Sequence, residues 1–295
     1  MAAQAGAGLR ARLEALPPPV FFVVGAVSQY LGAATAVSLF DSMAPPGVAL
    51  LRVGAAAAAL WAWRRPAWRR WTPRRRLLAA AFGVALACMN LAFYLAVERL
   101  PLGNAVAIEF LGPITVAALG VRTLRNALAL ALAVAGVGVL ADVELRAANG
   151  VGVAFALSAA ALWAGYIVLA ARVAGAGTDT GTDAGAGGGV DGLAFGGVVG
   201  ALAIAPIGAP HVGPALTDPV LLLACVGVGI FSNVIPYALD MVVLRRVTQG
   251  QFAFLLALLP ATAAAVGVLA LGQAPTAAEA VGIGLVVLAV AARQR

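Results

Sequence analysis

The segment RLPLGNAVAIEFLGPITVAALGV, residues 99–121, has a counterpart later in the chain, RVTQGQFAFLLALLPATAAAVGV, residues 246–268. With a shift of 147 residues, nine of the 23 positions are identical, including Pro113 with Pro260. A shift of 146 also aligns the Gly-Val-Gly at 136–138 with the Gly-Ile-Gly at 282–284. The glycines suit close helix packing in lipid. The repeat predicts a chain made of two similar halves.

The composition around this repeat predicts a polytopic membrane protein. Hydrophobic residues make up 63% of the chain and charged residues 11%, against roughly 45–50% and ~25% in soluble domains. A soluble cytosolic globule is therefore excluded. Ten apolar runs approach the ~20 residues that a membrane helix needs. They fall at 20–40, 46–63, 77–98, 103–121, 127–141, 150–172, 192–208, 219–240, 252–271 and 277–292.

Each half contains five of these runs, which decides the expected architecture. Because five is odd, a duplicated half enters the membrane from the opposite side, as in many alternating-access transporters. The expected fold class is an all-α integral membrane protein with ten transmembrane helices in two inverted five-helix repeats. The expected organisation is a cytoplasmic tail at 1–19, repeats at 20–141 and 142–292 with a flexible cytoplasmic linker at 173–191, and a cytoplasmic C-terminus at 293–295.

The basic residues predict the orientation. All 19 are arginine, and 16 of them fall in segments that are cytoplasmic if the N-terminus is inside, which agrees with the tendency of basic loops to stay in the cytoplasm. Both termini are therefore expected in the cytoplasm, in a multi-pass protein of the cytoplasmic (inner) membrane. The Trp and Arg residues at 63–71 are interpreted as interfacial anchors, in preference to a functional anionic-lipid site.

Three polar residues are predicted at similar depth in the outer half of the membrane. Arg52 and Glu109 each lie about 9 Å from the outer ends of their runs, and Asn90 about 11 Å, at ~1.5 Å per residue. A lone charge at this depth costs at least ~2.5–3.5 kcal/mol. Arg52 and Glu109 are therefore expected to face each other or to share a water-filled cavity, although a static ion pair is the alternative. Gln29 could bind substrate or bridge helices.

The repeated prolines are candidates for kinks in gating helices. Proline supplies no N–H to the carbonyl four residues earlier, so Pro113 frees the carbonyl of Glu109, and Pro260 that of Leu256. Freed carbonyls are tolerated in lipid where protein or a water-lined cavity satisfies them. Both helices are therefore expected to line a central pathway. Packing kinks without any ligand contact are the alternative.

A second polar set is predicted toward the inner side. Asn233, Tyr237 and Asp240 share one stripe of a helix, and Trp163 and Tyr166 share a face of another. Together these residues could form a vestibule that binds a cation through aromatic faces and a carboxylate. Alternatively, the aromatic residues form an interfacial belt, and Asp240 pairs with a nearby arginine.

Several chemistries lack the residues they require. His211 is the only histidine, so neither a His-based nucleophile arrangement nor a metal site is expected. The chain has no lysine, which excludes a Walker-type ATP loop. Cys88 and Cys225 are interpreted as buried apolar residues. We expect no enzyme activity, no cofactor, no metal and no nucleic-acid partner.

At these polar positions the sequence resembles the EamA branch of the drug/metabolite transporter superfamily, and within it the bacterial threonine/homoserine exporters. The resemblance covers about residues 20 to 290, and its most specific part is the segment around Glu109. The matching segments are Gly32–Ala34, Ser38–Phe40, Pro46–Val48, Leu51-Arg52, Met89-Asn90, Phe93-Tyr94, Pro101–Gly103, Ala105–Phe110, Gly112-Pro113, Trp163-Ala164, Tyr166-Ile167, Ile235–Tyr237 and Leu239–Met241.

This resemblance implies ten helices in two EamA-type repeats and proton-driven export of small amino acids or related metabolites. It also makes Tyr94 a candidate substrate contact. Three positions depart from the family pattern. Leu259 and Gln273 stand where relatives have glutamate, and Asp240 replaces the usual glutamate. The missing carboxylate at 259 removes a possible cation or proton site.

The sequence thus favours a secondary active exporter for a small zwitterion such as threonine or homoserine, with protons as the coupling ion. The substrate carboxylate would meet Arg52 or Asn90. Its ammonium would meet Glu109, Asp240 or aromatic faces, and Glu109 would also carry the proton. The alternatives are an exporter of the same fold for a different hydrophobic or cationic solute, a channel, and a non-transporting membrane scaffold or sensor.

Overall fold

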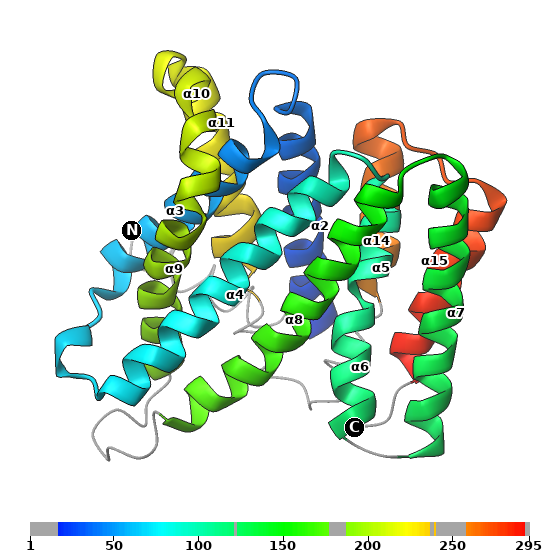
Figure 1. Cartoon of the computed structure of the whole chain (residues 1–295), viewed down its shortest axis with the longest axis horizontal. Coiled ribbons are helices and arrows are strands. Elements are labelled where there is room, and N and C mark those ends of the chain that lie inside the picture. The colour runs from blue at the N-terminus through cyan, green and yellow to red at the C-terminus, as the bar shows by residue number, and fades with distance from the viewer. Residues whose placement is uncertain (1–16, 121–122, 177–186, 237–238, 240–257, 293–295) are drawn as a thin grey trace, which may run out of the picture.

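The computed structural model describes residues 17–120, 123–176, 187–236, 239 and 258–292, and its regular elements are all helices (Figure 1). Six of them are long and apolar enough to cross a membrane. These are α2 (Pro18–Ser38), α3 (Pro45–Arg64), α4 (Pro73–Val97), α7 (Leu124–Arg146), α8 (Gly150–Ala176) and α9 (Gly187–Gly208). The predicted all-α membrane class is confirmed at this level.

Four shorter apolar helical segments accompany them, at Leu102–Val116, Pro219–Val234, Leu258–Leu271 and Ala277–Ala292. The first comprises α5 (Leu102–Glu109) and α6 (Leu111–Gly120), and the second comprises α11 (Pro219–Gly229) and the π-helix η3 (Ile230–Val234). The others are α14 (Leu258–Leu271) and α15 (Ala277–Ala292). Pro113 lies just after the α5–α6 break at Phe110, where the sequence predicted a kink.

Residues suited to helix starts begin several of these elements. Proline occupies the first turn of α2, α3, α4 and α11, where its missing N–H costs nothing. Thr72 accepts the N–H of Arg75 at the start of α4, and Asp218 accepts the N–H of Val220 at the start of α11. The chain then alternates between two ends: the α4–α5, α7–α8 and α14–α15 turns lie at the top of Figure 1, and the α3–α4 turn lies at the bottom.

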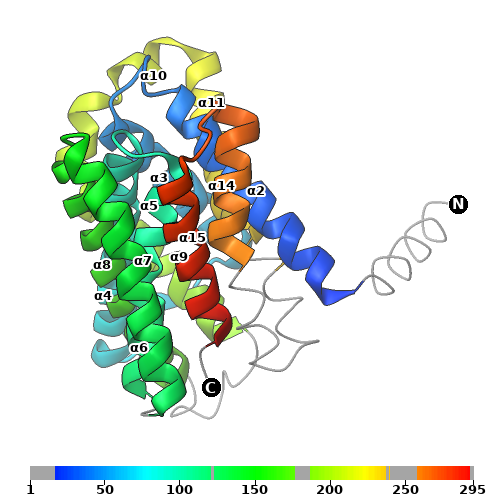
Figure 2. The ribbon, with the colours of Figure 1, turned by 90° about the vertical axis from the view of Figure 1, so that its right-hand side faces the viewer.

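Glycine allows the closest helix contacts. In the pair α7 and α15, which lie side by side in Figure 2, a Cβ added at Gly136 would be 2.7 Å from the carbonyl oxygen of Gly282. The expected packing role of the glycine motifs is therefore confirmed for Gly136 and Gly282. It is wrong for Gly138 and Gly284, whose added Cβ atoms would meet nothing within 4 Å.

Two boundaries differ from those predicted. Residues 173–176 and 187–191 are helical, so α8 and α9 extend into both ends of the stretch predicted as a linker, because a helix can continue past the apolar run that identifies it. The predicted continuous helix at 219–240 also changes to a π-turn at η3.

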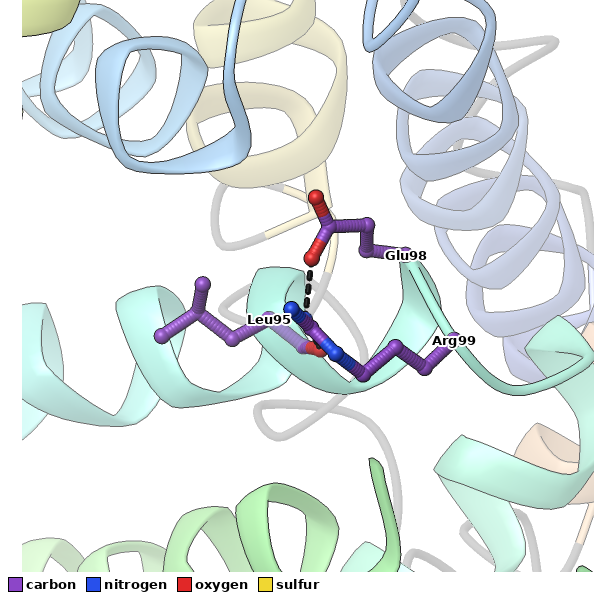
Figure 3. Close-up of polar contacts among 3 residues, drawn as sticks. All are labelled: Leu95, Glu98 and Arg99. Atoms are coloured by element: carbon purple, nitrogen blue, oxygen red, sulfur yellow. Dashed lines mark hydrogen bonds and ion pairs between the residues drawn. The ribbon is translucent and has the colours of Figure 1, made fainter. Parts of the chain in front are cut away.

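Charged side chains lie near the turns at both ends. At the end of α4, Arg99 donates to the Leu95 carbonyl at 2.9 Å and pairs with Glu98 (Figure 3). Near the opposite turn, the guanidinium of Arg75 lies 4.3 Å from the ring centroid of Trp71, and Arg64 pairs with Asp191 of α9 at 2.9 Å. Partly exposed ion pairs at helix ends contribute little to stability.

Candidate functional site

A buried arginine is the centre of the site. Arg52 of α3 is only 5% exposed, and its Nη2 donates a hydrogen bond to Asn233 Oδ1 of η3 at 3.0 Å. Its Cζ lies 4.9 Å from the ring centroid of Tyr94, a completely buried residue of α4. The consecutive helices α3 and α4 and the distant η3 thus bring Arg52, Tyr94 and Asn233 together, and we call these three residues the arginine cluster.

The arginine cluster contains hydrogen-bonding groups without partners. Arg52 Nε, Arg52 Nη1 and the Tyr94 hydroxyl are buried and have no hydrogen-bond partner of standard geometry among the described residues, although the Tyr94 hydroxyl and the Arg52 guanidinium interact with each other. Burying such groups unsatisfied is costly, the more so for a charged group. Such groups are rare in native structures. One explanation is that a bound ligand supplies the missing hydrogen-bond partners.

Glu109 carries the opposite charge beside this cluster. It is the last residue of α5 and is 7% exposed. Its carboxylate is close enough to Arg52 for their charges to interact, and it also interacts electrostatically with buried Tyr30 of α2. Within the described part of the chain, no ion pair or hydrogen bond joins Glu109 to Arg52. The two groups interact electrostatically without direct contact, and the water-filled cavity that the sequence predicts between them stays a prediction.

The other predicted outer residues are arranged differently. Asn90 is buried one turn before Tyr94 on α4, but its side-chain amide donates to the Leu86 carbonyl of the same helix at 2.8 Å. Gln29 is half-buried, and its backbone carbonyl accepts a hydrogen bond from the Ser232 hydroxyl at 3.4 Å. Asn90 and Gln29 therefore lie in helices that contribute to the site, and their observed hydrogen bonds are with the protein itself.

The predicted inner set is divided. Asn233 bonds to Arg52 of α3. Tyr237 and Asp240, with which the sequence predicts that it shares a stripe, lie outside the described residues, so this grouping stays a prediction. Trp163 packs edge-on against Phe110 with ring centroids 5.0 Å apart, directly beside the α5–α6 break. Tyr166 stacks on Phe82 at 4.8 Å.

Asn233 lies in a local irregularity of its helix, the π-turn η3. The π-turn of η3 adds a residue to the helical turn, and π-bulges occur frequently at functional sites. Two bonds with α2 hold it: Ser28 donates to the Phe231 carbonyl at 2.8 Å, and Ser232 donates to the Gln29 carbonyl.

The prolines of the two repeats are both buried. Pro113 lies in α6, just after the break that leaves Glu109 at the end of α5. Pro260 lies in the first turn of α14, and Leu256, whose carbonyl it was predicted to free, lies outside the described residues. The predicted gating role of both prolines stays a prediction.

A second polar network was missed by the sequence analysis. The Asn104 side-chain amide of α5 donates to Glu144 of α7 at 2.7 Å and also to Glu279 of α15. All three side chains are buried, at 1%, 3% and 7% exposure. A cavity of about 180 Å³ lies beside Asn104, Glu279 and Gln273. Gln273 accepts the backbone N–H of Leu102 at 2.9 Å and so caps α5. Both glutamates lie near the ends of apolar runs, where the sequence predicts charged residues in exposed loops.

The chain was compared with known proteins. It is 35% identical over 280 residues to the threonine/homoserine exporter RhtA of Escherichia coli K12, covering 92% of this chain and 89% of the relative. It is 33% identical over 290 residues to RhtA of Salmonella typhimurium SL1344, covering 96% and 92%. No family model matches. A crystal structure that is 20% identical superposes with a TM-score of 0.52 over 93% of this chain and 94% of the other, which supports the fold alone.

Proposed function

We propose that this chain, which belongs to the RhtA family of threonine/homoserine exporters in the EamA branch of the drug/metabolite transporter superfamily, exports small amino acids such as threonine or homoserine across the cytoplasmic membrane. The observation that carries this proposal is a pair of buried ionisable side chains, the guanidinium of Arg52 and the carboxyl group of Glu109. A zwitterion carries both complementary charges. Ionisable groups inside membrane helices generally belong to substrate or ion pathways.

The proposed architecture is ten helices in two inverted repeats, 20–141 and 142–292, with both termini in the cytoplasm. Six long and four shorter apolar helical segments, alternating between two ends, support the number of crossings. Transport would proceed by alternating access, with Pro113 and Pro260 as kinks in helices that change shape. The inner vestibule of Trp163, Tyr166, Tyr237 and Asp240 remains part of this proposal.

Coupling is assigned to Glu109. Its buried carboxylate makes no hydrogen bond with the described residues, so it is available to bind either a proton or the substrate ammonium. Competition between the two at one carboxylate would let the proton gradient drive export. This role does not need the family glutamates that Leu259 and Gln273 replace.

Counterflow in proteoliposomes tests the function. Vesicles containing the purified protein are preloaded with one unlabelled amino acid and diluted into trace labelled solute, with and without a pH gradient. We expect accumulation with threonine and homoserine, and stimulation of net export by the gradient. Protein-free vesicles are the control. If the vesicles exchanged a hydrophobic cation but none of the amino acids tested, this result would favour an exporter of the same fold for another solute.

A further inference from the structure

The strongest unexplained feature of the site is the set of unpartnered donors in the arginine cluster. Arg52 Nε, Arg52 Nη1 and the Tyr94 hydroxyl are buried without an acceptor, although the guanidinium Cζ is 4.9 Å from the Tyr94 ring. We infer that Arg52 and Tyr94 form a subsite for the free carboxylate of the solute, with Asn233 as a positioning residue. This inference rests on the proposed function and specifies its substrate class.

The chemistry of the donors selects a carboxylate. All of these unpartnered groups can donate hydrogen bonds. A carboxylate supplies two acceptor oxygens, and its negative charge balances the positive charge of the buried guanidinium. Asn90 is not among these unpartnered donors, because its side-chain amide already donates a hydrogen bond to the Leu86 carbonyl of its own helix. When it is ionised, the buried carboxyl group of Glu109 repels a ligand that carries a second negative charge on that side. A monocarboxylate with a cationic or neutral remainder fits both conditions.

Asn233 fixes the orientation of the guanidinium. Its Oδ1 accepts from Arg52 Nη2, which leaves Nε and Nη1 for a ligand. The π-turn that carries Asn233 is itself bonded to α2 through Ser28 and Ser232. A preoriented arginine loses less freedom when it binds, so Asn233 contributes to affinity without contacting the solute.

The subsite makes a prediction about ligand discrimination. Binding to the purified full-length protein is measured for L-threonine and for L-threoninamide, which lacks the carboxylate charge. Hydrogen bonds to charged groups favour a ligand roughly ten- to hundredfold, so we expect threoninamide to bind weaker by about that factor. Equal binding of the two ligands would overturn the subsite while leaving amino-acid export intact.

Substitutions identify the residues that distinguish threonine from threoninamide. We expect Tyr94→Phe to weaken threonine binding several-fold and threoninamide binding far less. The ratio of the threoninamide Kd to the threonine Kd should therefore decrease. Asn233→Leu should also decrease this ratio of dissociation constants. Ser158→Ala, which removes an exposed hydroxyl on α8, is the control. The ratio is taken within one variant, so it does not depend on yield. A ratio unchanged in both Tyr94→Phe and Arg52→Gln would contradict the assignment.

A ligand without an amino group separates this inference from the proposed function. Thermal stabilisation of the protein by 3-hydroxybutyrate is compared with that by 3-hydroxybutyramide. Stabilisation by the acid alone, lost in Arg52→Gln, would support the subsite even if no amino acid exchanged in vesicles. If threonine exchanged but neither its binding nor this stabilisation depended on a carboxylate, export would stand and the subsite would fall.

Discussion

Arg52 and Glu109 are two ionisable residues that are both buried and do not form an ion pair with each other. A single unpaired charge at membrane depth has a high free-energy cost. This cost falls when a zwitterionic solute pairs its two charges with the two side chains. This arrangement differs from a static structural pair, in which direct contact would satisfy the two side chains permanently. The distinction can be tested by removing one charge at a time.

Glu109→Gln keeps the size and hydrogen-bonding capacity of the side chain but removes its titration. We expect stimulation of export by a pH gradient to fall to the background level, while substrate exchange without a gradient survives. The measurements are abundance in the membrane, substrate binding and the pH dependence of export.

A structural pair predicts a different pattern for the same position. Glu109→Gln would then strand Arg52 and reduce abundance, and combining it with Arg52→Gln would restore both abundance and driven transport. Recovery of proton-driven export in that double variant would rule out coupling through Glu109.

At the scale of elements, Asn104 joins three helices through its two carboxylate acceptors, Glu144 and Glu279. Asn104→Ala leaves one oxygen of each buried carboxylate without its donor. We expect the free energy of unfolding in detergent to fall by about 1–3 kcal/mol. Asn149→Ala is a matched control, because it removes only the half-buried partner of Glu144, and its effect should be smaller. Equal losses would argue against the network as the link between α5, α7 and α15.

The contact between α7 and α15 gives a second test at this scale. Gly136→Ala places a methyl group 2.7 Å from the Gly282 carbonyl oxygen, and such overpacking costs about 1–3 kcal/mol. Gly138→Ala meets open space and gains up to ~1 kcal/mol in helix propensity. We therefore expect opposite shifts in melting temperature. A similar shift for both variants would show that the close approach does not matter.

For the whole molecule, the main prediction is orientation. Cysteines are introduced singly at Gly188 and Gly213 in a chain without Cys88 and Cys225. Gly188 lies in the first turn of α9, on the side predicted to be cytoplasmic, and Gly213 begins α10 in open space at the other end. An impermeant maleimide added to intact cells should label only the cysteine at position 213. Labelling only at position 188 would reverse the proposed topology.

Sequence alone determined the class of this protein and the ingredients of its site. Apolar run lengths predict membrane helices because lipid cannot satisfy exposed backbone groups. Charge is so unfavourable in lipid that Arg52 and Glu109 could be identified from their depth alone. The segment around Glu109 also indicated the family that the relatives then supported.

The tertiary structure decided which of these residues meet. Asn233 meets Arg52 because η3 packs against α2 and α3, and no pattern within either segment of sequence predicts that contact. Asn104, Glu144 and Glu279 form one network only because α5, α7 and α15 come together. Sequence periodicity predicts the depth and face of a side chain within its own helix. Its partners depend on how the helices rotate and cross, and that is fixed by contacts between distant segments.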